Sequence, residues 1–163
     1  IVIPFYDLEN DLTAFQGRSL NDSKIRYITV KVTEQSNKIY GIDRLDLTQD
    51  IYVVEGPIDS MFLPNSIAVS GSSFDTPTVR QLLTNATIVM DNEPRNKEIV
   101  KQLDKYIELG YSVCMFPDTI VKKDINEMIL HGGITSDEIV DLINTNTYTG
   151  MEAKLIFGKW RKC

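Results

Sequence analysis

Residues 50–59 read D-I-Y-V-V-E-G-P-I-D, and this stretch decides the fold of the chain. The apolar run from Ile51 to Val54 is β-branched and aromatic, which predicts a buried strand. Gly56 and Pro57 then force a turn directly after Glu55. The Glu55 carboxylate is therefore expected at the carboxyl end of a strand, which is where open α/β sheets bind their ligands.

A second apolar run, from Ala86 to Met90, ends in the same way at Asp91, Asn92 and Glu93. Two strands that end at one sheet edge would bring three acidic groups together, as Mg²⁺-dependent phosphate chemistry requires. Ordinary loop carboxylates after buried strands are the alternative interpretation of each run taken alone. The two runs together favour the metal site.

After residue 47, strand-like and helix-like segments alternate. The expected strands are 51–54, 66–70, 86–90 and 111–116, and the expected helices between them are 76–85 and 95–109. Such alternation predicts an α/β fold, with a parallel sheet covered by helices. Two further helices are expected at 124–130 and 136–143. Residues 153–157 are expected to form a strand or an extended exit from the domain.

The first 46 residues are β-rich, and a hairpin is expected between Ile1–Tyr6 and Leu12–Leu20. Basic side chains then alternate with aromatic ones, and these are Lys24, Arg26, Tyr27, Lys31, Lys38 and Tyr40. This pattern suits a track for single-stranded nucleic acid, because phosphates take the charge and bases stack on the rings. The solvated face of a small sheet is the alternative. We expect three parts: a basic β-rich subdomain (1–46), an α/β domain (47–146) and a basic C-terminal extension (147–163).

The charge is unevenly distributed along the chain of 163 residues, whose formal net charge is −6. Residues 47–153 hold seven Lys or Arg against sixteen Asp or Glu, whereas residues 154–163 hold four Lys or Arg and no acid. The net negative charge argues against general coating of nucleic acid. A nucleic acid would therefore touch the flanks and meet the acidic site through divalent metal. A solvated chain end is the alternative interpretation of the basic tail.

The composition is that of an ordinary globular protein, with 42% hydrophobic and 25% charged residues. No apolar stretch reaches the 18 or so residues of a membrane span, so no membrane association is expected. The two cysteines, Cys114 and Cys163, have no metal or redox spacing, which favours a reduced, cytoplasmic protein. The chain opens on Ile1 with strand-like residues and no signal peptide. We interpret it as a piece of a longer protein.

Four carboxylates are expected at one edge of the sheet: Glu55, Asp91, Glu93 and Asp124. Mg²⁺ prefers hard oxygen ligands and keeps several waters, so a few carboxylates and a substrate phosphate suffice. Glu55 is expected to be either a metal ligand or a general base. For Asp59, four residues later, helix capping and metal binding both remain open.

Other sites are less well supported by the residues. The run Ser70-Gly71-Ser72-Ser73 ends a strand. Its backbone and hydroxyl donors, those of Gly71 and Ser72 first, could cradle a phosphate, although a plain turn is the commoner meaning. His131 is the only histidine and has no nucleophile-elbow partner, so a catalytic triad is not expected. The sequence contains no phosphate-binding P-loop and no dinucleotide fingerprint. Zinc is not supported, because two cysteines and one histidine are widely scattered.

Three acidic motifs resemble those of the Toprim fold: E-G-P-I-D at 55–59, D-N-E at 91–93 and K-D-I-N-E at 123–127. The segments I-P-F at 3–5, A-F-Q-G-R at 14–18 and 24–29 are similar to the region that precedes this fold in replicative primases. The resemblance covers about residues 1–145. It is closest to primases of T-even-type tailed phages, through E-G-P-I-D-S-M-F-L-P-N at 55–65 and D-N-E-P-R at 91–95.

The resemblance implies a Toprim-type parallel sheet with flanking helices and a DNA-directed RNA polymerase that makes short primers. It implies that Glu55, Asp91, Glu93 and Asp124 hold Mg²⁺ or Mn²⁺ for two-metal nucleotidyl transfer, with Glu55 as ligand or base. It also implies that Arg18, Lys24 and Arg26 guide the nucleic acid. The implied partners are a single-stranded DNA template, ribonucleoside triphosphates and a replicative helicase. The implied location is the cytoplasm, which would be that of the host for a phage protein.

The chain departs from the family pattern in three places. Glu93 stands where aspartate is usual, and Asn126 stands where bacterial enzymes tend to carry a further aspartate. The family's zinc module is missing, which puts efficient initiation by this chain in doubt. A Toprim nuclease or topoisomerase fragment is therefore one alternative, and a catalytically silent binding module is another. Metal binding would separate the silent module from the enzymes, and ribonucleotide incorporation would separate the primase from a nuclease.

Overall fold

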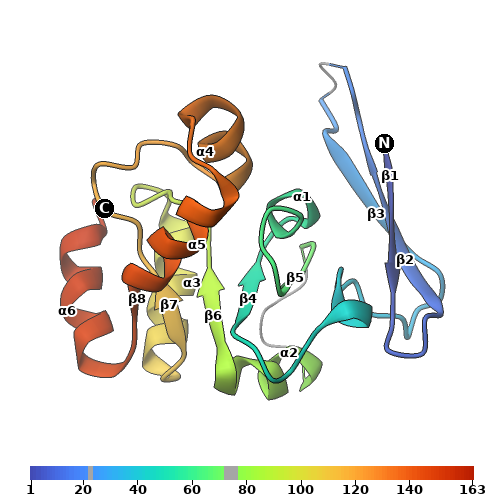
Figure 1. Cartoon of the computed structure of the whole chain (residues 1–163), viewed down its shortest axis with the longest axis horizontal. Helices are drawn as coiled ribbons and strands as arrows, with labels where there is room; N and C mark the ends of the chain where they lie inside the picture. Colours follow the sequence, from blue (N-terminus) through green and yellow to red (C-terminus); the bar gives the residue numbers. More distant parts are fainter. Residues whose placement is uncertain (22–23, 72–76) are drawn as a thin grey trace.

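The computed structural model describes residues 1–21, 24–71 and 77–163, which form two β-sheets. The small sheet is antiparallel, with the order β1 (Val2–Tyr6), β2 (Leu12–Arg18), β3 (Tyr27–Lys31). The large sheet has the order β5-β4-β6-β7-β8, made of β4 (Ile51–Val54), β5 (Ser66–Ala68), β6 (Ala86–Val89), β7 (Ser112–Cys114) and β8 (Thr147–Tyr148). Its pairings are parallel except for that of β8 with β7. Figure 1 shows the small sheet at one end of the molecule.

Helices cover both faces of the large sheet. They are α1 (Pro57–Ser60), α2 (Pro77–Leu82), α3 (Lys97–Glu108), α4 (Ile125–Gly132), α5 (Ser136–Thr145) and α6 (Gly150–Trp160), with 3₁₀ turns η1 (Ile42–Arg44) and η2 (Leu83–Asn85). Leu103 of α3 and Phe157 of α6 pack on one face of the sheet. Met128 of α4, Ile139 of α5 and Phe5 of the small sheet pack on the other. The small sheet is thus docked on the same face as α4 and α5.

The strand β4 is buried on both faces. Ile51 and Val53 belong to the core under α3 and α6, and Tyr52 and Val54 belong to the core under α4 and α5. None of the four side chains is more than 3% exposed. Burial on both sides is typical of central parallel strands and explains why the sequence is a continuous apolar run rather than an alternating one.

Local sequence signals account for the ends of the longer helices. The Asn96 side chain accepts a hydrogen bond from the Glu98 backbone N–H at the start of α3. Asp124 caps α4 in the same way, through the Glu127 N–H. Thr135 and Glu138 form a reciprocal capping box at the start of α5. Each cap satisfies backbone donors that the first helical turn leaves free, which typically contributes about 1 kcal/mol.

The α/β architecture and the hairpin between β1 and β2 are confirmed, with strand and helix ends shifted by one to three residues. The expectation for residues 153–157 was wrong, because they form part of the helix α6. Ala153, Phe157 and Trp160 are its buried residues, at a spacing that matches the helical period. Gly150 and Gly158 weaken the helical signal in the sequence, and burial of the apolar stripe outweighs their low propensity.

Within the described residues, α6 and β8 complete the large sheet and its helical layer, although they lie in the segment 147–163 that the charge pattern sets apart. The division at residues 46 and 146 stays a prediction. In the same residues, no helix has both the length and the apolar character that a membrane crossing needs.

Candidate active site

The carboxyl ends of β4 and β6 place two carboxylates side by side. The strands pair in parallel, with Val53 opposite Ile88, and Glu55 and Asp91 follow the strand ends. Together with Asp59 and Asp124 they line a small void of about 10 Å³. Four carboxylates from three separate chain segments thus surround a space of about one water molecule.

A wider cleft of about 230 Å³ opens in front of these carboxylates. It is lined on one side by the ends of the large-sheet strands and on the other by the small sheet, through Gln16, Arg18, Arg26 and Tyr27. The cleft therefore has an acidic wall and a basic, partly aromatic wall. The arrangement suits a phosphodiester strand, whose phosphates and bases need both kinds of partner.

Glu55 is the most strongly perturbed carboxylate of the site. Burial raises its pKa to about 7, helped by the nearby charge of Asp91 and opposed by Lys123 and the Asp91 backbone N–H. Its Oε1 is buried and has no hydrogen-bond partner. A buried carboxylate oxygen without a partner is costly, so this group is suited to receive a cation or to take a proton.

One of the two interpretations of Asp59 was that it caps its own short helix, α1. The N-cap of α1 is Gly56 instead, and no side-chain hydrogen bond caps it. The Oδ1 of Asp59 accepts a hydrogen bond from the Asn126 backbone N–H at 2.9 Å, so Asp59 fixes α4 against α1. Burial raises its pKa to about 6, and the charges of Asp124 and Asp91 add to this effect. A Cβ on Gly56 would lie 2.9 Å from the Asp59 carboxylate, so only glycine lets this carboxylate sit where it does.

Asp91 and Glu93 share a lysine. The Lys123 ammonium lies 3.2 Å from Asp91 and 3.4 Å from Glu93. Burial raises the pKa of Asp91, and Lys123 opposes that rise. Lys123 also accepts a hydrogen bond from Asn92 N at 2.6 Å through its carbonyl, which ties the two acidic loops together. Glu93 does not line the cleft with the other three carboxylates and reaches the site only through this lysine.

Arg18 and Arg26 both line the cleft, as the sequence analysis grouped them. Lys24 is exposed and is not among the residues that line it. Arg18 pairs with Tyr27 across β2 and β3, so both point to the same face of the small sheet. Sequence position alone could not separate Lys24 from the arginines, because the pairing of β2 with β3 decides which side chains face the cleft.

Gly71 lies at the edge of the cleft with a positive φ of 74°, and Ser72 lies outside the described residues. Ser70 belongs to the same run, 70–73, in which a phosphate cradle was considered. It also has a positive φ of 45°, and its Oγ is buried without a hydrogen-bond partner. A non-glycine residue in this conformation is uncommon and is often found at functional sites. Ser70 and Gly71 together offer an unpaired hydroxyl and a backbone turn beside Glu55.

The carboxylates of the site are the type of ligand that a divalent cation prefers, but their spacing is too wide for a metal-binding group. Among residues 1–21, 24–71 and 77–163, no group of three or more His, Cys, Asp or Glu side chains is close enough to hold a metal ion. The Oε1 of Glu55 nevertheless has no hydrogen-bond partner, and the pKa values of Glu55, Asp59 and Asp91 are raised. Both features are typical of a carboxylate cluster that lacks enough neighbouring positive charge. Lys123 supplies part of that charge at one side of the site.

Three residues of this site were missed or left open by sequence reasoning: Gln16, Asp59 and Lys123. Asp59 gave a signal, since it lies four residues after Glu55 in the same turn-and-helix segment. Lys123 gave a weaker one, as the residue before Asp124. Gln16 gave none of its own, because a buried polar residue inside a strand cannot be distinguished from a solvated one without the fold.

The two-sheet arrangement is that of primase catalytic cores. The chain superposes on the E. coli primase catalytic core with a TM-score of 0.69 at 17% identity, over 97% of this chain and 55% of that one. It superposes on a DnaG primase catalytic domain bound to single-stranded DNA with a TM-score of 0.71 at 14% identity, over 95% and 54%. At these identities the similarity shows a shared fold.

Sequence similarity gives a more specific relationship. The chain is 36% identical over 164 residues to the DNA primase of Enterobacteria phage T4, a match that covers 99% of this chain and 47% of that protein. The chain thus spans about half the length of this relative. No protein-family model matches it. The resemblance to Toprim-type primases is confirmed: the chain is similar in sequence to a phage DNA primase and in fold to primase catalytic cores.

Proposed function

We propose that this chain is the polymerising core of a primase, which makes short RNA primers on a single-stranded DNA template from ribonucleoside triphosphates. One observation carries the proposal: a single cleft joins Glu55, Asp59, Asp91 and Asp124 to Arg18, Arg26 and Tyr27. The relationship to a phage DNA primase supports it. The family relationship also supports a replicative helicase as partner and a role in the cytoplasm of the host.

The acidic wall would hold the divalent ion of the reaction. Glu55, Asp91 and Asp124 would hold Mg²⁺ or Mn²⁺, and Asp59 is a further candidate ligand. The ions supply charge neutralisation at the reacting phosphate and lower the pKa of the attacking hydroxyl. In the alternative role, with the metal held by the other carboxylates, Glu55 would take the proton of the 3′-hydroxyl, because burial brings its pKa to about 7.

The other wall would position the two polynucleotide strands and the nucleotide. Arg18 and Arg26 would contact phosphates, and Tyr27 offers a ring on which a base can stack. Lys123 is 48% exposed while it bridges Asp91 and Glu93, so its ammonium can also reach an incoming triphosphate. Ser70 and Gly71 would donate to phosphate oxygens from the edge of the cleft.

The test combines divalent-ion binding with ribonucleotide incorporation on single-stranded DNA, for the wild type and Glu55→Gln. We expect product that depends on Mg²⁺ or Mn²⁺ and that disappears in the variant, while circular dichroism shows an intact fold. Glu152→Gln is the matched control, because Glu152 is exposed on α6. Metal binding with cut DNA and no RNA would point to a nuclease instead. A chain that binds no divalent ion would be a binding module, which would overturn the proposal.

A further inference from the structure

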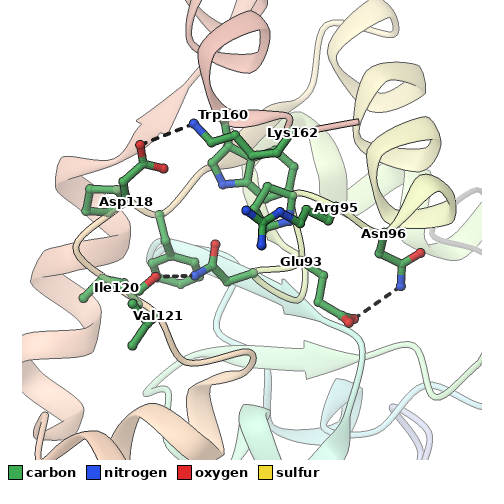
Figure 2. A pocket seen from close by; sticks show the side chains of 12 residues that line it. Glu93, Arg95, Asn96, Asp118, Ile120, Val121, Trp160 and Lys162 are labelled. Atoms are coloured by element: carbon green, nitrogen blue, oxygen red, sulfur yellow. Dashed lines mark hydrogen bonds and ion pairs between the residues drawn. The ribbon is translucent and has the colours of Figure 1, made fainter.

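A second, larger pocket of about 530 Å³ lies beside the loop that follows β6. Asp91 of this loop lines the carboxylate cleft, whereas Asn92 to Asn96 line the pocket. The remaining walls come from the loop after β7 and from the end of α6 (Figure 2). The proposed polymerase chemistry does not use this pocket, and its volume is within the range of small-molecule sites.

The charged groups at the pocket favour an anionic ligand. Arg95 is exposed and has no hydrogen bond or ion pair within the described part of the chain. Lys162 pairs with Asp118 at 3.3 Å, but Asp118 is 78% exposed, so the pair is weak and easily exchanged. Glu93 points away from the pocket centre toward Asn96 (Figure 2) and also pairs with Lys123. Arginine without a partner at a concave surface is a typical phosphate contact.

Part of the pocket lining is apolar. It contains Phe116, Pro117, Ile120 and Trp160, and Trp160 is only 7% exposed. The Trp160 indole Nε1 is buried and has no hydrogen-bond partner. A donor of this kind is costly when left unpaired, and a ligand that brings an acceptor would satisfy it. A nucleobase combines a flat π-face with ring-nitrogen and carbonyl acceptors.

The end of the chain is held against the pocket rather than frayed. Lys162 N donates to the Pro94 carbonyl at 2.8 Å, so the loop after β6 and the end of α6 form one surface. The Arg161 guanidinium lies over the Phe157 ring at 5.6 Å. The basic tail therefore extends the positive rim of the pocket, with aromatic rings among the charges.

We propose that this pocket binds one nucleotide unit, with its base against Trp160 and its phosphate at Arg95. The unit is either a free nucleotide or a nucleotide within a single strand, which have the same chemistry. This inference goes beyond the proposed function and does not rest on it, because the carboxylate cleft takes no part. If both hold, a nucleotide at this pocket would lie across the same loop from the polymerising site.

Trp160 is the only tryptophan of the chain, so its fluorescence reports on this pocket alone. The chain is titrated in EDTA with ATP and, separately, with a short oligothymidylate. We expect saturable quenching, because a base stacked near an indole quenches its emission. Quenching by both probes would assign the pocket to the nucleotide unit itself, and quenching by the oligomer alone would assign it to a strand. If neither ATP nor the oligothymidylate quenches the fluorescence at millimolar concentration, the proposal is overturned.

Single-residue variants test whether the nucleotide binds at this pocket. Arg95→Ala should weaken binding about tenfold, as expected for the loss of a charge-assisted hydrogen bond. Val121→Asp should also weaken it, because Val121 lines the pocket, is 85% exposed and would add a negative charge. Lys101→Ala is the control, since Lys101 is an exposed cation of α3 outside the pocket. If Arg18→Ala in the cleft reduces quenching while Arg95→Ala and Val121→Asp do not, the nucleotide binds elsewhere and the proposal fails.

Discussion

The two sheets of this molecule contribute opposite chemistry to the cleft, and they do so from opposite structural conditions. The parallel sheet supplies carboxylates at strand ends whose residues are fully packed, as in β4, where every side chain is buried. The small sheet supplies arginines and a tyrosine from strands packed on one face only, and no residue of β3 is fully buried. The carboxylates, which must keep a fixed geometry, therefore lie on the fully packed sheet. The arginines and the tyrosine, which would follow a flexible nucleic-acid strand, lie on the partly exposed sheet.

The largest effect of a substitution is expected at the acidic wall of the cleft. Asp91→Asn should abolish primer synthesis and leave the fold intact, because the amide keeps the shape and removes the charge that a cation needs. Ribonucleotide incorporation and circular dichroism measure the two effects. Asp104→Asn on the exposed face of α3 is the control. Retained synthesis by Asp91→Asn would remove this residue from the metal site.

Core substitutions test the packing difference directly. Ile88 of β6 is 0% exposed, so Ile88→Ala should reduce the free energy of unfolding by about 2–5 kcal/mol. Ile28 of β3 is 54% exposed, so Ile28→Ala should cost less than about 1 kcal/mol. Urea unfolding of both variants gives the comparison. Equal losses would mean that the outer face of the small sheet is covered in solution.

The pH dependence of stability should report the crowded carboxylates. The folded-state pKa of Glu55, about 7, lies above the value near 4.5 of an unfolded chain, so the folded state keeps this proton longer. Its contribution is complete below the unfolded value and is lost as the pH rises through the folded one, an effect on the order of 2 kcal/mol. Thermal unfolding in EDTA should therefore show stability falling from pH 5 to pH 8. Glu55→Gln should flatten this decline, and a parallel decline in the variant would contradict the assignment.

The smallest effect is expected at the basic wall. Arg18→Ala should weaken binding of single-stranded DNA a few-fold and reduce the salt slope by about 0.7, the value for one phosphate contact on a single strand. Lys24→Ala should change both less, because Lys24 does not line the cleft. Fluorescence anisotropy at several salt concentrations measures the slopes. An unchanged slope for Arg18→Ala would give Arg18 a structural role.

Much of the parallel sheet could be predicted, because its strands are buried on both faces and appear as uninterrupted apolar runs, as from Ile51 to Val54. The positions of Glu55 and Asp91 followed from the same signal, since each comes directly after such a run. The helix α6 could not be predicted in this way. Its buried stripe is short and two glycines interrupt it, so only the sheet against which Phe157 packs decides its conformation.

The sequence by itself determined the α/β class, the succession of strands and helices along residues 51–143 and the two strand-end carboxylates, because local burial and turn chemistry specify them. Only the tertiary structure decided which cations face those carboxylates, that Asp59 joins them and that Lys123 bridges Asp91 and Glu93. It also created the pocket at Trp160, whose walls come from segments 20 or more residues apart in the chain. Such sites depend on how separate elements dock, and docking follows from the packing of distant side chains rather than from any local pattern.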